Sequence, residues 1–339
     1  MSTKESIIAL DGMGGDNAPF SVIKACEMLS CSENIKIIIV GDEKQIKDKI
    51  NFEKYPFVTL EHCEKSIKMD NKINLKLFKE KDNSMVRTIS LVKRGMAHCA
   101  LSAGNTAAFV SYSISELGLI KNIARPAIAL LMPDTTGRGI IFIDGGANIK
   151  AKPVHLIQSA VMGTLYAEYV FGIRNPRVAL LNRGEEETKG DELRRESFAL
   201  MSENRRINFI GNIEGHNIFT QKADVIITDG FTGNVVLKVS EGVTRAFRTI
   251  LMKEIQKSIR GKVGVFFIRN ILKDFAKKAD YAEYGGGLLL GVDGIVIISH
   301  GRSSPRAIYN AIRLGKRIVS SGFIEKLKKD METIQWEMQ

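Results

Sequence analysis

Short apolar runs rich in β-branched residues alternate with longer stretches of helical periodicity along almost the whole chain. Runs of the first kind are typical of buried strands, and the longer stretches are typical of helices that connect parallel strands. We therefore expect an α/β fold with a mostly parallel sheet and helices on both faces. The predicted strands cover residues 6–10, 35–40, 57–61, 98–101, 127–132, 139–143, 177–181, 207–210, 224–228 and 294–298.

A polar or glycine-rich turn follows nearly every predicted strand. Because ligands of open α/β sheets gather beyond the carboxyl ends of the strands, these turns predict one shared cleft. The alternative is that Gly and Asp simply make good connections. With no internal repeat or linker in the sequence, we expect residues 1–339 to form a single domain with two lobes around that cleft. The turns are DGMGGD (11–16), SAGNT (102–106), DGGAN (144–148), NRGEEETKG (182–190), TDGFTGN (228–234) and SHGRSS (299–304).

The first turn is close to a dinucleotide-binding loop without meeting its pattern. The fingerprint G-x-G-x-x-G needs a third glycine where the sequence IIALDGMGGDNAP has Asn17. Glycines in this turn still let the backbone approach a ligand closely. We predict that Gly14, Gly15 and Asp16 contact the substrate and that Asp11 braces the turn.

Small polar residues precede a predicted helix in LSAGNTAAF (101–109). Free backbone N–H groups at a helix start point toward an anion. We therefore expect Ser102, Gly104, Asn105 and Thr106 to bind a phosphate or an oxyanion. An ordinary helix cap would use the same residue types.

Lys189 ends the turn NRGEEETKG, which begins at a strand end with Asn182. We predict that Lys189 is a phosphate ligand, although the P-loop pattern G-x-x-x-x-G-K-[ST] is absent. The alternative is a solvated surface lysine.

Two further turns, DGGANIKAKPVH (144–155) and TDGFTGNVVLK (228–238), place small polar residues after strands. In TDGFTGNVVLK (228–238), Thr232 or Asn234 can cap the following helix. Asp229 can bind a hydroxyl group, a cation or Lys189. The predicted site residues from these two turns are Asn148, Thr228, Asp229, Gly230 and Asn234.

His300 is the best placed of the 5 histidines, since it stands in SHGRSS at another helix start. No histidine forms a ligand pattern with cysteine or a second histidine, so we expect no metal. The 4 cysteines form no C-x-x-C pair, which favours a reducing compartment. No G-x-S-x-G elbow or activated cysteine is present, which argues against a covalent acyl-enzyme. The site is therefore expected to hold an anion with backbone dipoles and without a cofactor.

The charge distribution indicates the kind of partner. The chain has 44% apolar residues, enough for a substantial core, and a formal net charge of +11. Such a charge implies an acidic partner, which could be nucleic acid, anionic lipid or an acidic protein. More than half of it lies in residues 251–279.

That basic region lies within a long helical stretch predicted at about residues 243–282. A cationic amphipathic helix with aromatic residues suits an anionic membrane surface, and the alternative is packing in a dimer interface or in the core. No apolar run reaches the roughly 18 residues of a membrane span, and the N-terminal apolar run is too short for a signal peptide. We therefore expect a cytoplasmic protein, peripherally associated with the membrane. The predicted membrane-contact residues are Phe266, Phe267, Ile268, Ile271, Leu272 and Phe275.

Taken together, the turns resemble the motifs of the PlsX family, the phosphate acyltransferases of bacterial lipid synthesis. The resemblance spans nearly the whole chain in the right order. Two departures are the segment LFKEKDNSM (77–85), where the family is basic, and Lys150, where an Asp is usual. The matching segments are IALDGMGGDNAP (8–19), SAGNT (102–106), DGGAN (144–148), LLNRGEEETKG (180–190), TDGFTGNVVLK (228–238), YGGGLLLG (284–291) and HGRSS (300–304).

The resemblance implies transfer of a fatty acyl group from acyl carrier protein to inorganic phosphate, without a cofactor. It also implies a fold similar to phosphate acetyltransferases and to isocitrate and isopropylmalate dehydrogenases. Expected partners are acyl carrier protein, which is acidic, an anionic membrane surface, a second copy in a homodimer, and the downstream glycerol-3-phosphate acyltransferase.

This reaction suggests roles for the predicted residues. Phosphate would attack the thioester directly, held by Lys189 and the helix-start amides near Ser102 to Thr106. Amides of Gly14 to Asp16 or of Thr228 to Gly230 would stabilise the oxyanion. His300 would donate a proton to the leaving thiol.

Three other functions are weaker. A dehydrogenase lacks its fingerprint, and a soluble acyltransferase that uses short acyl-coenzyme A esters differs only in substrate. A nucleic-acid binder is suggested by charge alone, because few aromatic residues are interleaved with the basic ones.

Overall fold

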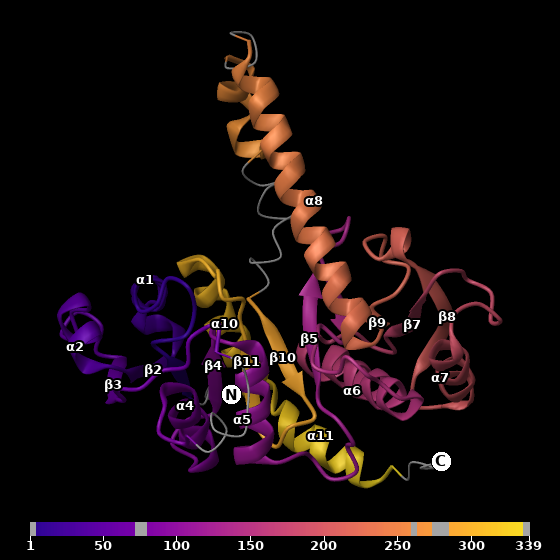
Figure 1. Ribbon diagram of the computed structural model, residues 1–339, viewed down its shortest axis with the longest axis horizontal. Coiled ribbons are helices and arrows are strands. Elements are labelled where there is room, and N and C mark those ends of the chain that lie inside the picture. Colours follow the sequence, from indigo (N-terminus) through magenta and orange to yellow (C-terminus); the bar gives the residue numbers. More distant parts are fainter. Residues whose placement is uncertain (1–4, 72–79, 259–262, 273–284, 335–339) are drawn as a thin grey trace.

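One sheet of 11 strands forms the centre of the protein, in the order β3-β2-β1-β4-β11-β10-β5-β6-β9-β7-β8 (Figure 1). The computed structural model describes residues 5–71, 80–258, 263–272 and 285–334. The strands are β1 (Ser6–Asp11), β2 (Ile35–Gly41), β3 (Val58–His62), β4 (Cys99–Ser102), β5 (Ala127–Met132), β6 (Ile140–Ile143), β7 (Arg177–Asn182), β8 (Asn208–Glu214), β9 (Val225–Ile227), β10 (Gly287–Leu290) and β11 (Ile295–Ile298).

Every predicted strand is present, and the mostly parallel α/β fold is confirmed. The prediction missed β10, whose sequence GLLL follows a run of glycines. β10 is antiparallel to both of its neighbours, β11 and β5, and β5 is antiparallel to β6. The other strand pairs are parallel. Three successive reversals therefore make the two halves of the sheet run in opposite directions.

Helices cover both faces of the sheet. Successive side chains of a strand point to opposite faces, so apolar side chains on both faces need to be covered. In β4, Cys99 and Leu101 join one core cluster and Ala100 joins another. The first cluster packs against α1, α6, α10 and α11, and the second against α4 and α5. The helices are α1 (Phe20–Glu27), α2 (Glu43–Ile46), α4 (Ser84–Lys93), α5 (Thr106–Leu117), α6 (Pro153–Phe171), α7 (Glu192–Glu203), α8 (Gly230–Gln256), α10 (Pro305–Ser321) and α11 (Phe323–Glu332).

Helix α8 begins at the sheet and then projects far from it (Figure 1). Its only buried residues are Gly230 and Gly233, which pack against the turn that follows β6. Residues 263–272 form a further helical segment, so the described parts of the stretch predicted at 243–282 are helical. Residues 273–282 lie outside the described part of the chain. No helix among the described residues is long and apolar enough to cross a membrane.

Candidate active site

The direction of the strands decides how the six turns are arranged. β1, β4 and β11 end at one edge of the sheet, whereas β6, β7 and β9 end at the opposite edge. The turn after β6 folds over β5, with the N–H of Gly145 donating to the carbonyl of Ile128 at 2.9 Å. Helix α8 brings Asn234 and Lys238 to the same place. Five of the six turns, or the helix that follows them, therefore contribute to one cleft, and the turn after β7 does not.

This cleft has a volume of about 890 Å³ and lies between α5 and α8. The strand register places Ile298 level with Leu130 on either side of Gly287, so these side chains form an apolar wall. The polar residues lie beyond the ends of β1 and β11, at the start of α5 and on α8. The apolar lining includes Val110, Ile128, Leu130, Leu237 and Ile298, and the polar lining includes Asp16, Thr106, Asn234, Lys238, Glu241, Arg245, His300 and Arg302.

Asp11 braces the first turn from inside the protein. It is 1% exposed and accepts hydrogen bonds from the Ser102 hydroxyl at 2.6 Å and the Met13 N–H at 3.2 Å. Burial raises the pKa of Asp11 above its ordinary value. A Cβ on Gly14 would lie 2.5 Å from the Asp11 carboxylate, so only glycine fits there. Asp11 thus fixes the turns after β1 and β4 to each other.

The turn after β4 leads into α5. Ser102 Oγ donates to Asp11 and accepts the Gly104 N–H at 3.0 Å, so this hydroxyl supports the turn. Asn105 caps α5 by accepting the Ala108 N–H at 3.1 Å. Thr106 lines the cleft at the first helical position, where backbone N–H groups have no intrahelical partner. The helix start therefore offers donors to an anion.

The turn after β1 contacts the turn after β11. Gly15 has φ of +105°, and the next N–H, that of Asp16, donates to the Gly301 carbonyl at 2.8 Å. The Arg302 guanidinium lies 3.7 Å from the Asp16 carboxylate. Asp16 lines the cleft, whereas Gly14 and Gly15 position it.

His300 lies in the cleft beside Lys238, which is not among the residues predicted for the site. Its Nε2 lies 3.0 Å from Lys238 Nζ, and its Nδ1 accepts the Arg302 N–H at 3.1 Å. Burial first, and then the charge of Lys238, lower the pKa of His300 below its ordinary value. This shift favours the neutral form of the imidazole. Lys238 ends the segment TDGFTGNVVLK, and only the course of α8 brings it to His300.

Hydrogen bonds within the protein hold the Asn148 side chain in the turn after β6. Its side-chain amide donates to the Pro126 carbonyl at 2.5 Å and to Asp144 at 2.9 Å. Asp144 also accepts backbone N–H groups within the turn, including that of Asn148 at 2.8 Å. The Asn148 carbonyl accepts the Gly230 N–H at 2.9 Å. These bonds fix the turn against the start of α8.

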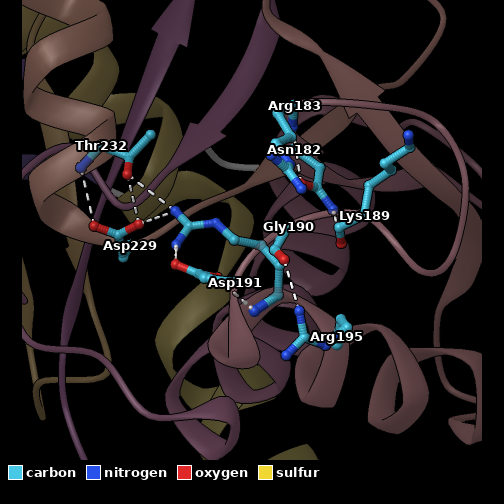
Figure 2. Close-up of polar contacts among 9 residues, drawn as sticks. Asn182, Arg183, Lys189, Gly190, Asp191, Arg195, Asp229 and Thr232 are labelled. Carbon is cyan, nitrogen blue, oxygen red and sulfur yellow. Dashed lines mark hydrogen bonds and ion pairs between the residues drawn. The ribbon is translucent and has the colours of Figure 1, made fainter.

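Asp229 anchors the start of α8, as Figure 2 shows. It is 5% exposed, accepts the Thr232 N–H at 2.9 Å and the Thr232 hydroxyl at 2.7 Å, and pairs with Arg194. Burial alone would raise the pKa of Asp229, but these hydrogen bonds and Arg194 together hold it below its ordinary value. Arg194 also bonds Asp191 at 2.7 Å. Asp229 therefore binds an arginine of α7, while Thr228 beside it is 1% exposed.

Lys189 and Asn182 lie apart from this cleft. Asn182 lines a second cavity of about 640 Å³ with Gly190 and Arg194. Its amide donates to the Lys189 carbonyl at 3.0 Å. The Lys189 side chain extends away from Asp229 (Figure 2) and lies 3.7 Å from Glu186. The position of β7 in the sheet accounts for this separation: β6 and β9 lie between β7 and β5, so the turn after β7 is further from the cleft than the turns after β6 and β9.

The predicted membrane-contact residues are mostly exposed. Phe267 is 77% exposed and Ile271 68% exposed, and Phe266 and Ile268 are also exposed. Leu272 is half-buried, and Phe275 lies outside the described residues. Within the described ranges, no group of three or more His, Cys, Asp or Glu side chains could hold a metal ion.

Comparison with known proteins assigns the family. A model of the fatty acid synthesis protein family matches residues 7–326. A phosphate acyltransferase of Desulfitobacterium hafniense (strain DSM 10664 / DCB-2) is 44% identical over 326 residues, which cover 96% of this chain and 97% of the relative. A phosphate acyltransferase of Staphylococcus aureus (strain JH9) is 40% identical over 323 residues, covering 95% and 97%.

Solved structures agree on the fold. The EutD phosphotransacetylase from Staphylococcus aureus has a TM-score of 0.61 and 16% identity, covering 94% of this chain and 95% of that one. A 4-hydroxythreonine-4-phosphate dehydrogenase from Klebsiella pneumoniae has a TM-score of 0.55 and 12% identity, covering 94% and 100%. The family model and the similar sequences show more than the fold. The chain belongs to the fatty acid synthesis protein family, the PlsX family that its motifs indicated.

Proposed function

We propose that this chain transfers a fatty acyl group from acyl carrier protein to inorganic phosphate by direct attack of phosphate on the thioester. The observation that carries the proposal is a cleft in which an apolar wall meets a cationic end. A fatty acyl chain and a phosphate dianion require these two environments next to each other.

The apolar wall suits the acyl chain. Val110 of α5, Leu130 of β5 and Leu237 of α8 line the cleft from three sides of the fold. Each methylene group buried against such a wall contributes about 0.8 kcal/mol to binding. Several buried methylenes would therefore favour a long acyl chain over an acetyl group.

The cationic end suits phosphate. The start of α5 at Thr106 presents unpaired backbone N–H groups. The cations Lys238, Arg245 and Arg302 line the same cleft with two carboxylates, Asp16 and Glu241, so the positive charges are in excess. Lys189 is not among the residues that line this cleft. Its predicted role as a phosphate ligand rests on its place in the turn NRGEEETKG and is tested by substitution.

The proposed reaction conserves atoms and charge. An oxygen of HPO₄²⁻ attacks the thioester carbon, the C–S bond breaks, and the products are an acyl phosphate and a thiol. The proton of the phosphate passes to the leaving sulfur. His300, whose lowered pKa favours the neutral ring, would take this proton as base at its unprotonated ring nitrogen and then donate it to the leaving sulfur.

Backbone amides would stabilise the tetrahedral intermediate. Of the two predicted donor turns, the one that ends at Asp16 borders the cleft. The turn from Thr228 to Gly230 is instead buried against residues 144–148. We therefore favour the first turn for this role, through the N–H of Gly15, because the Asp16 N–H donates to Gly301 and the Gly14 N–H bonds Asp11.

Charge at the cleft supports the choice of acyl donor. Arg245 and Arg302 line the cleft, and Arg248 and Lys253 continue the positive charge along the exposed part of α8. An acidic carrier protein that presents its thioester to this cleft would meet complementary charge.

The exposed apolar residues of 263–272 support a peripheral position on an anionic membrane. Phe266, Phe267, Ile268 and Ile271 would enter the interface, beside Arg269. The exposed Val239 and Phe247 of α8 offer a face to a second copy in a homodimer. Cytoplasmic placement at the membrane would deliver the acyl phosphate to a downstream glycerol-3-phosphate acyltransferase.

A substrate panel tests the proposed function. Purified protein with phosphate is given acyl carrier protein thioesters or coenzyme A thioesters of several chain lengths, and acyl phosphate is trapped as a hydroxamate. We expect product from long-chain acyl carrier protein. Product from short coenzyme A esters alone would identify a soluble coenzyme A enzyme, and an NAD-dependent absorbance change without acyl phosphate would identify a dehydrogenase.

A further inference from the structure

Ser299, the residue directly after β11, has a buried hydroxyl group without a hydrogen-bond partner in the described part of the chain. The residue is 2% exposed, and its backbone N–H donates to the Ser102 carbonyl at 2.9 Å. The backbone is therefore satisfied while Oγ is not. Burying an unpaired hydroxyl costs free energy, so such a group calls for an explanation.

The position of Ser299 indicates where a partner would lie. Ser299 lines the cleft between Ile298, which belongs to the apolar wall, and His300, which contacts Lys238. It therefore stands where the apolar wall ends and the cationic end begins. These two parts of the cleft meet at this residue.

The backbone opposite Ser299 leaves space beside the hydroxyl. Gly286 also lines the cleft, with φ of +98°. A Cβ at that position would lie only 3.0 Å from Ser299 Oγ. Glycine at 286 therefore keeps a side chain away from Oγ, and a turn about the Cα–Cβ bond to another staggered position would redirect the hydroxyl without moving the backbone.

We propose that Ser299 Oγ donates a hydrogen bond to the thioester carbonyl oxygen and to the oxyanion that forms when phosphate attacks. This inference rests on the proposed function. With the acyl chain along Leu130 and phosphate near Thr106, the reacting carbonyl group lies between them, where Ser299 stands. The hydroxyl keeps its proton and forms no covalent bond, and it pairs most strongly when negative charge develops on the oxygen.

This role predicts opposite effects of Ser299→Ala on stability and on activity. The substitution removes an unpaired buried hydroxyl, so the melting temperature should stay the same or rise. Loss of one oxyanion donor lowers kcat by about 10²- to 10³-fold in other enzymes, and we expect a loss in that range. The KM for phosphate should change little, because the donor acts on the carbonyl oxygen.

Ser197 provides a matched control. It is 0% exposed, its hydroxyl is also unpaired, and it lies on α7 without lining the cleft. Ser197→Ala should leave kcat unchanged and the melting temperature equal or higher. Ser299→Cys nearly preserves the side-chain volume and supplies a weaker donor, so its kcat should lie between those of the wild type and Ser299→Ala.

The test measures acyl phosphate formation, the KM for phosphate and thermal unfolding for the wild type and the three variants. If the wild type forms no acyl phosphate, the proposed function fails. If it is active and folded Ser299→Ala keeps kcat within about twofold, the inference about Ser299 fails alone. A tenfold rise in the KM for phosphate at unchanged kcat would also overturn it, because the hydroxyl would then bind phosphate. Should Ser299→Ala not fold, the same criteria apply to Ser299→Cys.

Discussion

Removing the carboxylate of Asp229 should destabilise the protein at the start of α8. Asp229→Ala deletes the N-cap of this helix, a loss of about 1 kcal/mol. It also leaves Arg194, whose side chain is 13% exposed, without one of its two acidic partners. Breaking a buried ion pair costs about 3–5 kcal/mol, but Asp191 and Thr232 remain to pair Arg194. We therefore expect a total loss of about 3 kcal/mol in the free energy of unfolding.

Asp191→Ala is the matched control for that variant. Asp191 caps α7 and pairs with the same arginine, but its side chain is 59% exposed. Its loss should cost about 1 kcal/mol, because exposed ion pairs contribute little. Urea unfolding followed by circular dichroism measures both values. Equal losses for Asp229→Ala and Asp191→Ala would refute the view that a buried ion pair fixes α8 to α7.

Three further predictions concern the site and the membrane. Lys238→Met should raise the pKa of His300, because it removes a nearby positive charge, and the acid limb of the pH profile of kcat should move to higher pH. An acid limb that does not move would show that the protonation of His300 does not control kcat. Lys189→Ala should raise the KM for phosphate or lower kcat sharply, and unchanged kinetics would remove Lys189 from the site. The double variant Ile268→Glu/Ile271→Glu should lose co-sedimentation with anionic vesicles, whereas binding equal to that of the wild type would exclude this segment as the anchor.

Most of the fold could be predicted from the sequence because buried strands leave a clear apolar signal. β10 was missed since its short run GLLL follows glycines and has no β-branched residue. The two reversals at β10 cancel and leave β5 parallel to β11, so the antiparallel β5–β6 pair reverses the second half of the sheet. Sequence patterns locate strands well but carry little information on their direction.

Strand order decides which of the predicted site residues meet. The turns at Asp16, Thr106 and His300 follow β1, β4 and β11, which are neighbours in the sheet, and the structure brings them together. Asn234 follows β9, which runs in the opposite direction, and still lines the cleft, whereas Lys189 follows β7, which lies further from β5, and is found elsewhere. No local sequence pattern marked Lys238 as a site residue, because only the course of α8 brings it to His300.

Several residues in the family motifs act on the fold rather than facing the cleft. Asp11, Asp144 and Asp229 each accept hydrogen bonds from N–H groups of their own turn, and the Asn148 side chain donates to Asp144. A motif of small polar residues predicts that a turn is important, but it does not separate a side chain that binds substrate from one that holds the turn. Burial and hydrogen-bond partners make that distinction.

A single-turnover experiment tests the central claim most directly, namely that phosphate attacks the thioester without a covalent enzyme intermediate. Enzyme in excess is mixed with radiolabelled acyl carrier protein thioester, with and without phosphate, and quenched over a time course. The account predicts acyl phosphate only when phosphate is present, and no label on the protein chain at any time. Label transferred to the chain in the absence of phosphate, and released as acyl phosphate when phosphate is added, would contradict it.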